Sequence, residues 1–234
     1  MNRLHKIINK HLFFSLKESE KLILQGKVKV NNKIITTLGF NADLNKDLIS
    51  VNNEVIKNNI IKYYYFVFFK PSKVVCSKKD DFNRITIFDL LKINKKIIIT
   101  LFPVGRLDYL SEGVIILTNN RAISNKILNP LFKIKKVYII KIKGILTNEL
   151  FNKMKKKISE TIHFSQNDFK ILKRKNSTAW VKLSLYSGKN NYLKRFFWKL
   201  KCFVLKLIRI RIGKLTSKNL ILGQCKQISL NTIF

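Results

Sequence analysis

The stretch VGRLDYLSEGVIILTNN, residues 104–120, decides how the fold and the function of this chain are interpreted. It consists of a glycine-bounded loop followed by the apolar run Val114–Leu117, which is typical of a buried strand. Asp108 lies in the loop, two residues after Arg106. A partly buried carboxylate beside a cation is a candidate nucleophile, although an R-x-D triplet in a loop is more often a structural ion pair. These residues alone leave both interpretations open.

Strand-like and helix-like segments surround this loop on both sides. The longest apolar run, Tyr63–Phe69, predicts a buried strand that ends at Lys70-Pro71. Further strands are expected at 97–101, 114–118, 136–143, 179–186 and 203–212, and helices at 121–128, 147–157 and 189–200. Because the strands do not alternate regularly with helices, we predict an α+β domain with a mixed, largely antiparallel sheet flanked by helices.

The first 58 residues predict a separate small module. Leu4, Ile7, Ile8 and Leu12 recur at helical spacing. Ser15 and Glu18 form an S-x-x-E capping box at the start of a second helix, which should end at Gly26. Alternating apolar residues then flank the turn pairs Asn31-Asn32 and Asn52-Asn53, as in hairpins. We therefore divide the chain into residues 1–58 and 59–234.

The charge of the chain favours a polyanionic partner. Lys and Arg number 47 against 13 acidic residues, which gives a formal net charge of +34. Nucleic acid is the leading candidate and an anionic membrane surface is the second. The heavy use of Lys, Ile and Asn also fits an AT-rich coding bias, so part of this charge has a simpler explanation. The charge supports RNA binding without proving it.

Several other classes of protein are disfavoured. Cys76, Cys202 and Cys225 are scattered and odd in number, which fits a reducing compartment better than a disulfide framework. The three cysteines and three histidines show no zinc-ligand spacing. The longest apolar run is far shorter than the roughly 20 residues of a membrane span. We therefore expect a soluble, cytoplasmic protein without a metal site.

The order of residues 3–35, RLHKIINKHLFFSLKESEKLILQGKVKVNNKII, resembles the S4 RNA-binding domain. In that family a Ser-led second helix and the loop after it present basic side chains to structured RNA. The resemblance implies RNA contacts by the basic residues of the module, Arg3, Lys6, Lys17, Lys21, Lys27 and Lys29. Any one of these lysines is by itself most simply a solvated side chain, whereas their clustering favours RNA binding.

Residues 104–120 resemble the signature of the pseudouridine synthases that modify ribosomal RNA, in the branch with an N-terminal S4 domain. The pattern G-R-L-D-x-x-[ST]-x-G, an apolar strand and T-N-[DN] is met at every fixed position. Three further segments agree in order and spacing: FFKPSKVVCS (68–77), PLFKIKKVYIIKIKG (130–144) and SGKNNYLKRFFWKLKCFVLKLIRIRIGKL (187–215). The resemblance thus covers nearly the whole chain.

The resemblance also implies residue roles. Asp108 corresponds to the essential aspartate that attacks the nucleoside, so that the base leaves, rotates and rejoins through C5. Arg106 corresponds to a residue that fills the gap left by the flipped uridine. Tyr138 corresponds to the catalytic tyrosine that stacks on the flipped base and is linked to removal of the C5 proton. Lys194 stands where the family has the basic residue that pairs with the aspartate, and its neighbour Arg195 is a candidate for substrate binding. The isomerisation needs neither metal nor cofactor.

Each of these residues also has a simpler interpretation. Tyr138 alternates with apolar neighbours and fits a half-buried sheet residue, while Lys194 and Arg195 fit a solvated basic helix. The sequence also departs from the family pattern. Lys73 replaces a usual Gly, so the turn must avoid a left-handed conformation or strain to reach it. Asn191 replaces Arg and Tyr192 replaces Gln, which puts RNA affinity and the placement of Lys194 in doubt.

The hypothesis that follows is isomerisation of a specific uridine to pseudouridine in large-subunit ribosomal RNA, by a protein expected to act as a monomer. Small-subunit ribosomal RNA is the nearest alternative substrate. A non-catalytic RNA-binding assembly factor is the alternative from another class: the eroded positions favour it and the intact Asp108 loop opposes it. A membrane-surface protein would need a long amphipathic basic helix, which only 189–200 approaches.

Overall fold

The computed structural model describes residues 1–58, 60–160, 169–186 and 192–234, and the chain divides into two compact units, Met1–Lys62 and Tyr63–Phe234. The predicted division after residue 58 lies four residues before the observed one. Residues 189–191 of the helix predicted at 189–200, including Asn191, lie outside the described residues.

The first unit contains two helices and short strands. Its elements are β1 (Asn2–Arg3), α1 (Leu4–Leu12), α2 (Leu16–Leu24), β2 (Val28–Val30), β3 (Lys33–Ile34), β4 (Asn41–Ala42), β5 (Ile49–Val51) and β6 (Glu54–Val55). The capping box is confirmed: the Ser15 hydroxyl accepts from Glu18 N at 3.1 Å, and the Glu18 carboxylate accepts from Ser15 N at 2.7 Å. A sheet in the order β3-β2-β5-β6 packs on the helices through a core that includes Ile8, Ile23 and Ile49.

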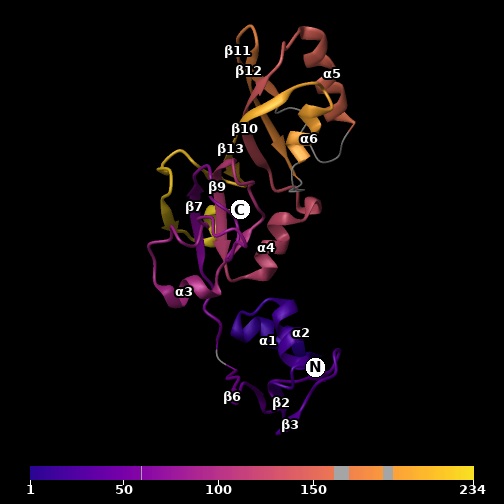
Figure 1. The fold of residues 1–234 in the computed structure, drawn as a ribbon, viewed down its shortest axis with the longest axis vertical. Helices are drawn as coiled ribbons and strands as arrows, with labels where there is room; N and C mark the ends of the chain where they lie inside the picture. The colour runs from indigo at the N-terminus through magenta and orange to yellow at the C-terminus, as the bar shows by residue number, and fades with distance from the viewer. Residues whose placement is uncertain (59, 161–168, 187–191) are drawn as a thin grey trace. The chain divides into compact units, whose positions relative to one another are not determined.

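The second unit is built on one large sheet (Figure 1). Its main strands are β7 (Tyr65–Lys70), β9 (Glu112–Thr118), β10 (Lys136–Lys143), β11 (Lys170–Arg174), β12 (Thr178–Leu185), β13 (Phe203–Ile212) and β15 (Cys225–Gln227). They lie in the order β11-β12-β10-β13-β9-β7-β15, with β13 and β9 parallel and the other neighbours antiparallel. The predicted mixed, largely antiparallel α+β architecture is confirmed.

The remaining elements of this unit flank the sheet. They are α3 (Lys95–Thr100), β8 (Phe102–Val104), α4 (Arg121–Leu128), η1 (Pro130–Phe132), α5 (Asn148–Ser159), α6 (Tyr192–Trp198), β14 (Leu215–Thr216) and η3 (Leu230–Thr232). One hydrophobic cluster joins one face of the sheet to α5 and α6 through residues such as Met154 and Phe197. A second cluster joins the other face of β7 and β9 to α4 through Ile127.

The predicted strand at 97–101 is wrong, because these residues belong to helix α3 and its C-terminal end. The β-branched run Ile97–Ile99 suggested a strand. In the structure the Asn94 side chain instead accepts from Lys96 N and caps a short helix. Ile97 and Ile98 pack against the core, while Ile99 is 67% exposed. A local cap and one-sided burial therefore override the strand preference.

One row of residues crosses the centre of the large sheet and brings together segments that are far apart in the sequence. Lys70 pairs with Gly113, Gly113 with Arg209, Arg209 with Tyr138, and Tyr138 with Leu183. Residues directly opposite one another on neighbouring strands point to the same face. Lys70, Arg209 and Tyr138 therefore lie on the face that carries α5 and α6.

Candidate active site

The Asp108 loop connects β8 to β9, and the turn that follows β7 holds it from one side. Lys73 N donates to Tyr109 O at 2.8 Å, and the Ser72 hydroxyl donates to Leu110 O at 3.2 Å. Leu107 N donates to the Cys76 sulfur at 3.4 Å. Within the loop, Ser111 N donates to Asp108 O at 2.9 Å. These bonds run along both sides of Asp108 and fix the backbone that carries its carboxylate.

Asp108 forms an ion pair with Lys194 of α6. Lys194 Nζ lies 2.9 Å from Asp108 Oδ2, and the two side chains are 31% and 35% exposed for Asp108 and Lys194 respectively. Helix α6 reaches this position because its buried residues Leu193 and Phe197 pack into the core of the sheet. A half-exposed pair contributes little to stability, at most about 1 kcal/mol. Its significance is that a carboxylate accessible to solvent is held beside a cation.

The other predicted site residues differ in their surroundings. Tyr138 is only 6% exposed and belongs to the same hydrophobic cluster as Leu107 and Leu193, the chain neighbours of Asp108 and Lys194. Arg106 and Arg195 are exposed. The structure thus brings Asp108 and Lys194 into contact and puts Tyr138 in the hydrophobic cluster that contains their chain neighbours, while Arg106 and Arg195 are exposed.

The basic residues predicted to bind RNA lie in the first unit. Arg3, Lys6, Lys17, Lys21 and Lys27 are exposed, and Lys29 is half-buried. Two of these side chains are bonded within the unit: the Arg3 guanidinium donates to Gly39 O, and Lys29 Nζ donates to Asn53 Oδ1 at 3.0 Å. Lys17 and Lys21 lie one turn apart on α2.

Lys70 is part of the site in a way that the sequence did not reveal, since Lys70-Pro71 looked like a simple strand end. Its side chain is fully buried, and Nζ donates to Ser111 O at 2.7 Å, Pro71 O at 2.9 Å and Tyr109 O at 3.3 Å. Burial lowers the pKa of Lys70 to about 8. A lysine ending an otherwise apolar buried strand was the available signal. Lys70 is thus a positioning residue for the Asp108 loop.

We expect Lys70→Met to reduce activity by loosening this loop and to change how stability depends on pH. The folded chain releases the Lys70 proton near pH 8, whereas an unfolded chain holds it until about pH 10.4. Stability from this group therefore rises with pH between these values. Relative to Lys70→Met, the wild-type free energy of unfolding should increase by roughly 1–2 kcal/mol between about pH 7.5 and 9.5 in urea titrations. A difference that is constant with pH would show that the Lys70 ammonium is not buried.

Lys73 adopts the left-handed conformation that its family counterpart, a glycine, would favour. Its φ is +60°, so replacing the glycine by Lys73 strains the backbone of the turn and leaves the conformation of the turn unchanged. Because the Lys73 side chain is exposed, little packing is lost on removing it. We expect Lys73→Gly to raise the free energy of unfolding by about 0.5–1 kcal/mol, and Lys73→Val to lower it, in urea titrations. Destabilisation by Lys73→Gly would contradict this explanation.

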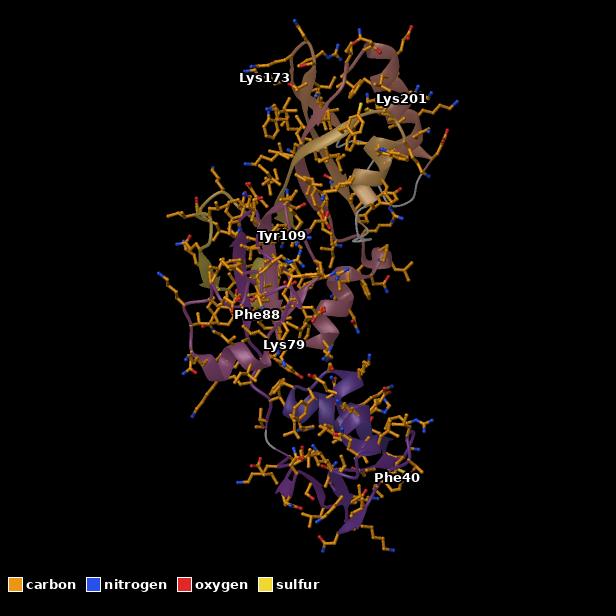
Figure 2. The ribbon with its side chains drawn as sticks, in the orientation of Figure 1. Phe40, Lys79, Phe88, Tyr109, Lys173 and Lys201 are labelled. Carbon is orange, nitrogen blue, oxygen red and sulfur yellow. The ribbon has the colours of Figure 1, made fainter. Side chains whose placement is uncertain are left out.

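An ion pair between Asp80 and Arg84 contacts the Asp108 loop through Tyr109. Arg84 forms an ion pair with Asp80 at 2.7 Å, and this bond lowers the pKa of the Asp80 carboxyl to about 2. The Arg84 guanidinium also lies 5.1 Å from the ring of Tyr109, the residue after Asp108, which is labelled in Figure 2. Sequence reasoning missed this contact because nothing local connects Arg84 with a loop more than twenty residues later.

The residues that the structure describes contain no group of three or more His, Cys, Asp or Glu side chains placed to hold a metal ion. Nor do they include a helix with the length and apolar character needed to cross a bilayer.

Comparisons with known proteins agree with the division of the chain into these two units. The family model described as RNA pseudouridylate synthase matches residues 64–199, and the S4 domain matches residues 2–48. The ribosomal large subunit pseudouridine synthase B of Bacillus subtilis is 33% identical, over 98% of this chain and 93% of its own length. An uncharacterized RNA pseudouridine synthase of Rickettsia conorii is also 33% identical, over 98% of this chain and 97% of its own.

A solved structure shows the same fold along the full chain. It is described as a pseudouridylate synthase, and it superposes with a TM-score of 0.64 at 23% identity, covering 100% of this chain and 98% of its own. The likeness therefore includes both units and the sheet that carries the Asp108 loop.

Proposed function

The chain belongs to the RNA pseudouridylate synthase family, with an N-terminal S4 domain, and we propose that it converts a uridine of large-subunit ribosomal RNA to pseudouridine with Asp108 as the nucleophile. The observation that carries the proposal is the ion pair of 2.9 Å between Asp108 and Lys194. It joins a motif loop and a helix that are far apart in the sequence.

The proposed reaction moves the glycosidic bond of one nucleoside without a net change in atoms. The Asp108 carboxylate attacks the nucleoside and forms a covalent bond to it, while the bond between the sugar and N1 breaks. The uracil then rotates and reattaches through C5, and the bond to Asp108 breaks so that the free carboxylate is restored. The uracil gains a proton at N1 and loses one at C5. The ion pair with the Lys194 ammonium holds the carboxylate in place, and the bonds from the turn at 70–76 fix its direction of attack.

The remaining residues would serve the flipped nucleotide. A uridine in a folded RNA must leave its base stack to reach Asp108, and this loss of stacking costs free energy. The exposed Arg106 would offset that cost by occupying the space that the uridine leaves. Tyr138 would contact the base from the hydrophobic cluster beside the ion pair. Because Tyr138 is 6% exposed, only a small part of its surface meets the base unless neighbouring side chains move. Arg195 would bind a nearby phosphate from the exposed side of α6.

The S4 domain would hold the RNA by its phosphates. Lys6, Lys17, Lys21 and Lys27 project from its surface into solvent, and the charge of the whole chain, +34, favours a polyanion. Arg3 and Lys29, which are bonded within the unit, would combine a structural role with RNA contact. We further propose that the protein acts as a monomer in the cytoplasm.

The large ribosomal subunit is proposed on account of the relatives. The Bacillus subtilis protein and one of Buchnera aphidicola, 29% identical over 92% of this chain, are both called ribosomal large subunit pseudouridine synthase B. Mapping of pseudouridine in unmodified large-subunit and small-subunit ribosomal RNA, each incubated with the purified protein, tests the choice. New pseudouridine in the large-subunit RNA alone is the expected result. Modification of small-subunit RNA alone would overturn the choice of subunit.

A non-catalytic RNA-binding assembly factor remains the second candidate, and the strained Lys73 and the altered Tyr192 favour it. That candidate predicts tight RNA binding by the wild-type protein with no pseudouridine in either ribosomal RNA.

A further inference from the structure

The sheet face opposite α5 and α6 carries a dense set of lysines around an aromatic residue. Trp180 of β12 pairs with Lys173 of β11 on one side and with Lys141 of β10 on the other, and Lys141 pairs in turn with Lys206 of β13. These four side chains therefore form one row across four strands on a single face. A neighbouring row is also basic, because Lys182 pairs with Lys170.

This face is separate from the one that carries the Asp108 site. Tyr138 and Leu183 alternate with the lysine-bearing positions and point into the core that α5 and α6 cover. Figure 1 shows α5 and α6 beside these strands, and the labelled Lys173 in Figure 2 lies on the side of the β11–β12 hairpin away from α5. Antiparallel sheets commonly bury one face and expose the other, but the exposed face usually mixes both signs of charge.

The side chains on this face are accessible to solvent. Lys170, Lys173 and Lys206 are exposed, while Lys141, Lys182 and Trp180 are half-buried. A second aromatic ring, Phe203, is 57% exposed and pairs with Lys143 further along the same strands. Glu112 offsets one of the charges through its ion pair of 3.0 Å with Lys206. The lysines on β11 and β12 lie farther along the sheet from this carboxylate.

We propose that this face, defined by Lys141, Lys170, Lys173, Lys182, Lys206 and Trp180, binds single-stranded RNA. The lysines would neutralise phosphates, and one base would stack on the Trp180 ring. Flat aromatic rings between basic residues suit single strands, because unpaired bases offer their faces while the phosphates run past the charges. The inference rests on the proposed function only in taking RNA as the partner, and it adds a contact surface away from the reacting uridine.

The test separates this surface from the rest of the chain. Dissociation constants for a single-stranded oligouridylate would be measured at several salt concentrations in an Asp108→Asn background, so that catalysis plays no part. Lys170→Glu with Lys173→Glu should weaken binding about tenfold or more and reduce the salt slope by about 2. The matched control is Lys95→Glu with Lys96→Glu, which makes the same charge change on the exposed side of α3. The control should weaken binding far less.

Trp180 supplies a local readout, since the chain has two tryptophans. In a Trp198→Phe background, oligouridylate should quench Trp180 emission, whereas polyglutamate, a polyanion without bases, should not. Trp180→Leu should weaken oligouridylate binding about fivefold. Equal weakening by the α3 control, or emission that does not respond to RNA, would overturn the proposal. Quenching by polyglutamate alone would assign the face to an acidic protein instead. Failure of the proposed function would be recognised separately, as absence of pseudouridine formation by the wild-type protein.

Discussion

Replacing Asp108 by Asn should abolish pseudouridine formation while leaving the fold and RNA binding in place. The substitution keeps the size of the side chain but removes the charge that makes it a nucleophile, and it breaks the ion pair with Lys194. Loss of a nucleophile has no local substitute, so we expect the single-turnover rate to fall by at least about a thousandfold. Stability should change by no more than about 1 kcal/mol, because the pair is half-exposed.

Glu112→Gln provides a matched control four residues away. Glu112 also forms a carboxylate–lysine ion pair, of 3.0 Å with Lys206, in the same segment of the chain. Its side chain belongs to the opposite face of the sheet, since its neighbour Gly113 lies in the row with Tyr138. We expect this variant to remain active. Activity retained by Asp108→Asn would assign the attack to another group. Absence of activity in both variants and in the wild type, with RNA still bound, would favour the assembly factor.

Gly113→Ala should strongly destabilise the second unit. A Cβ at this position would lie 2.2 Å from Arg209 O and 2.5 Å from Arg209 N, and the φ of +121° is one that L residues rarely adopt. The contact is with backbone atoms of β13, so relief requires the parallel strands β9 and β13 to separate. We expect a loss of at least about 3 kcal/mol of unfolding free energy in urea titrations, or no folded protein.

Gly223→Ala separates backbone strain from steric clash as causes of this loss of stability. Gly223 has a φ of +78°, and a Cβ there would meet nothing within 4 Å. Its substitution therefore measures backbone strain without a clash, for which about 1–2 kcal/mol is expected. If Gly113→Ala were no worse than Gly223→Ala, close packing of β9 on β13 would not be the reason for this glycine.

Local patterns in the sequence determined several elements of both units. The run after the Asp108 loop predicted β9, the segment 136–143 predicted β10, and the S-x-x-E pattern predicted the start of α2. These predictions succeed because a strand on a buried sheet, or a capped helix, depends mostly on residues within one turn or one strand. The same reasoning failed for α3, where the β-branched residues predicted a strand but the Asn94 cap and burial of one side gave a helix.

The tertiary structure alone decided how these elements make a site. Only strand pairing puts Lys70, Gly113, Arg209 and Tyr138 in one row, and only the packing of α6 brings Lys194 to Asp108. The burial of Lys70 and the basic outer face around Trp180 depend on the same pairing. The sequence pattern indicates which face of each strand is buried. The register between strands that are far apart in the sequence follows instead from the packing of the whole sheet.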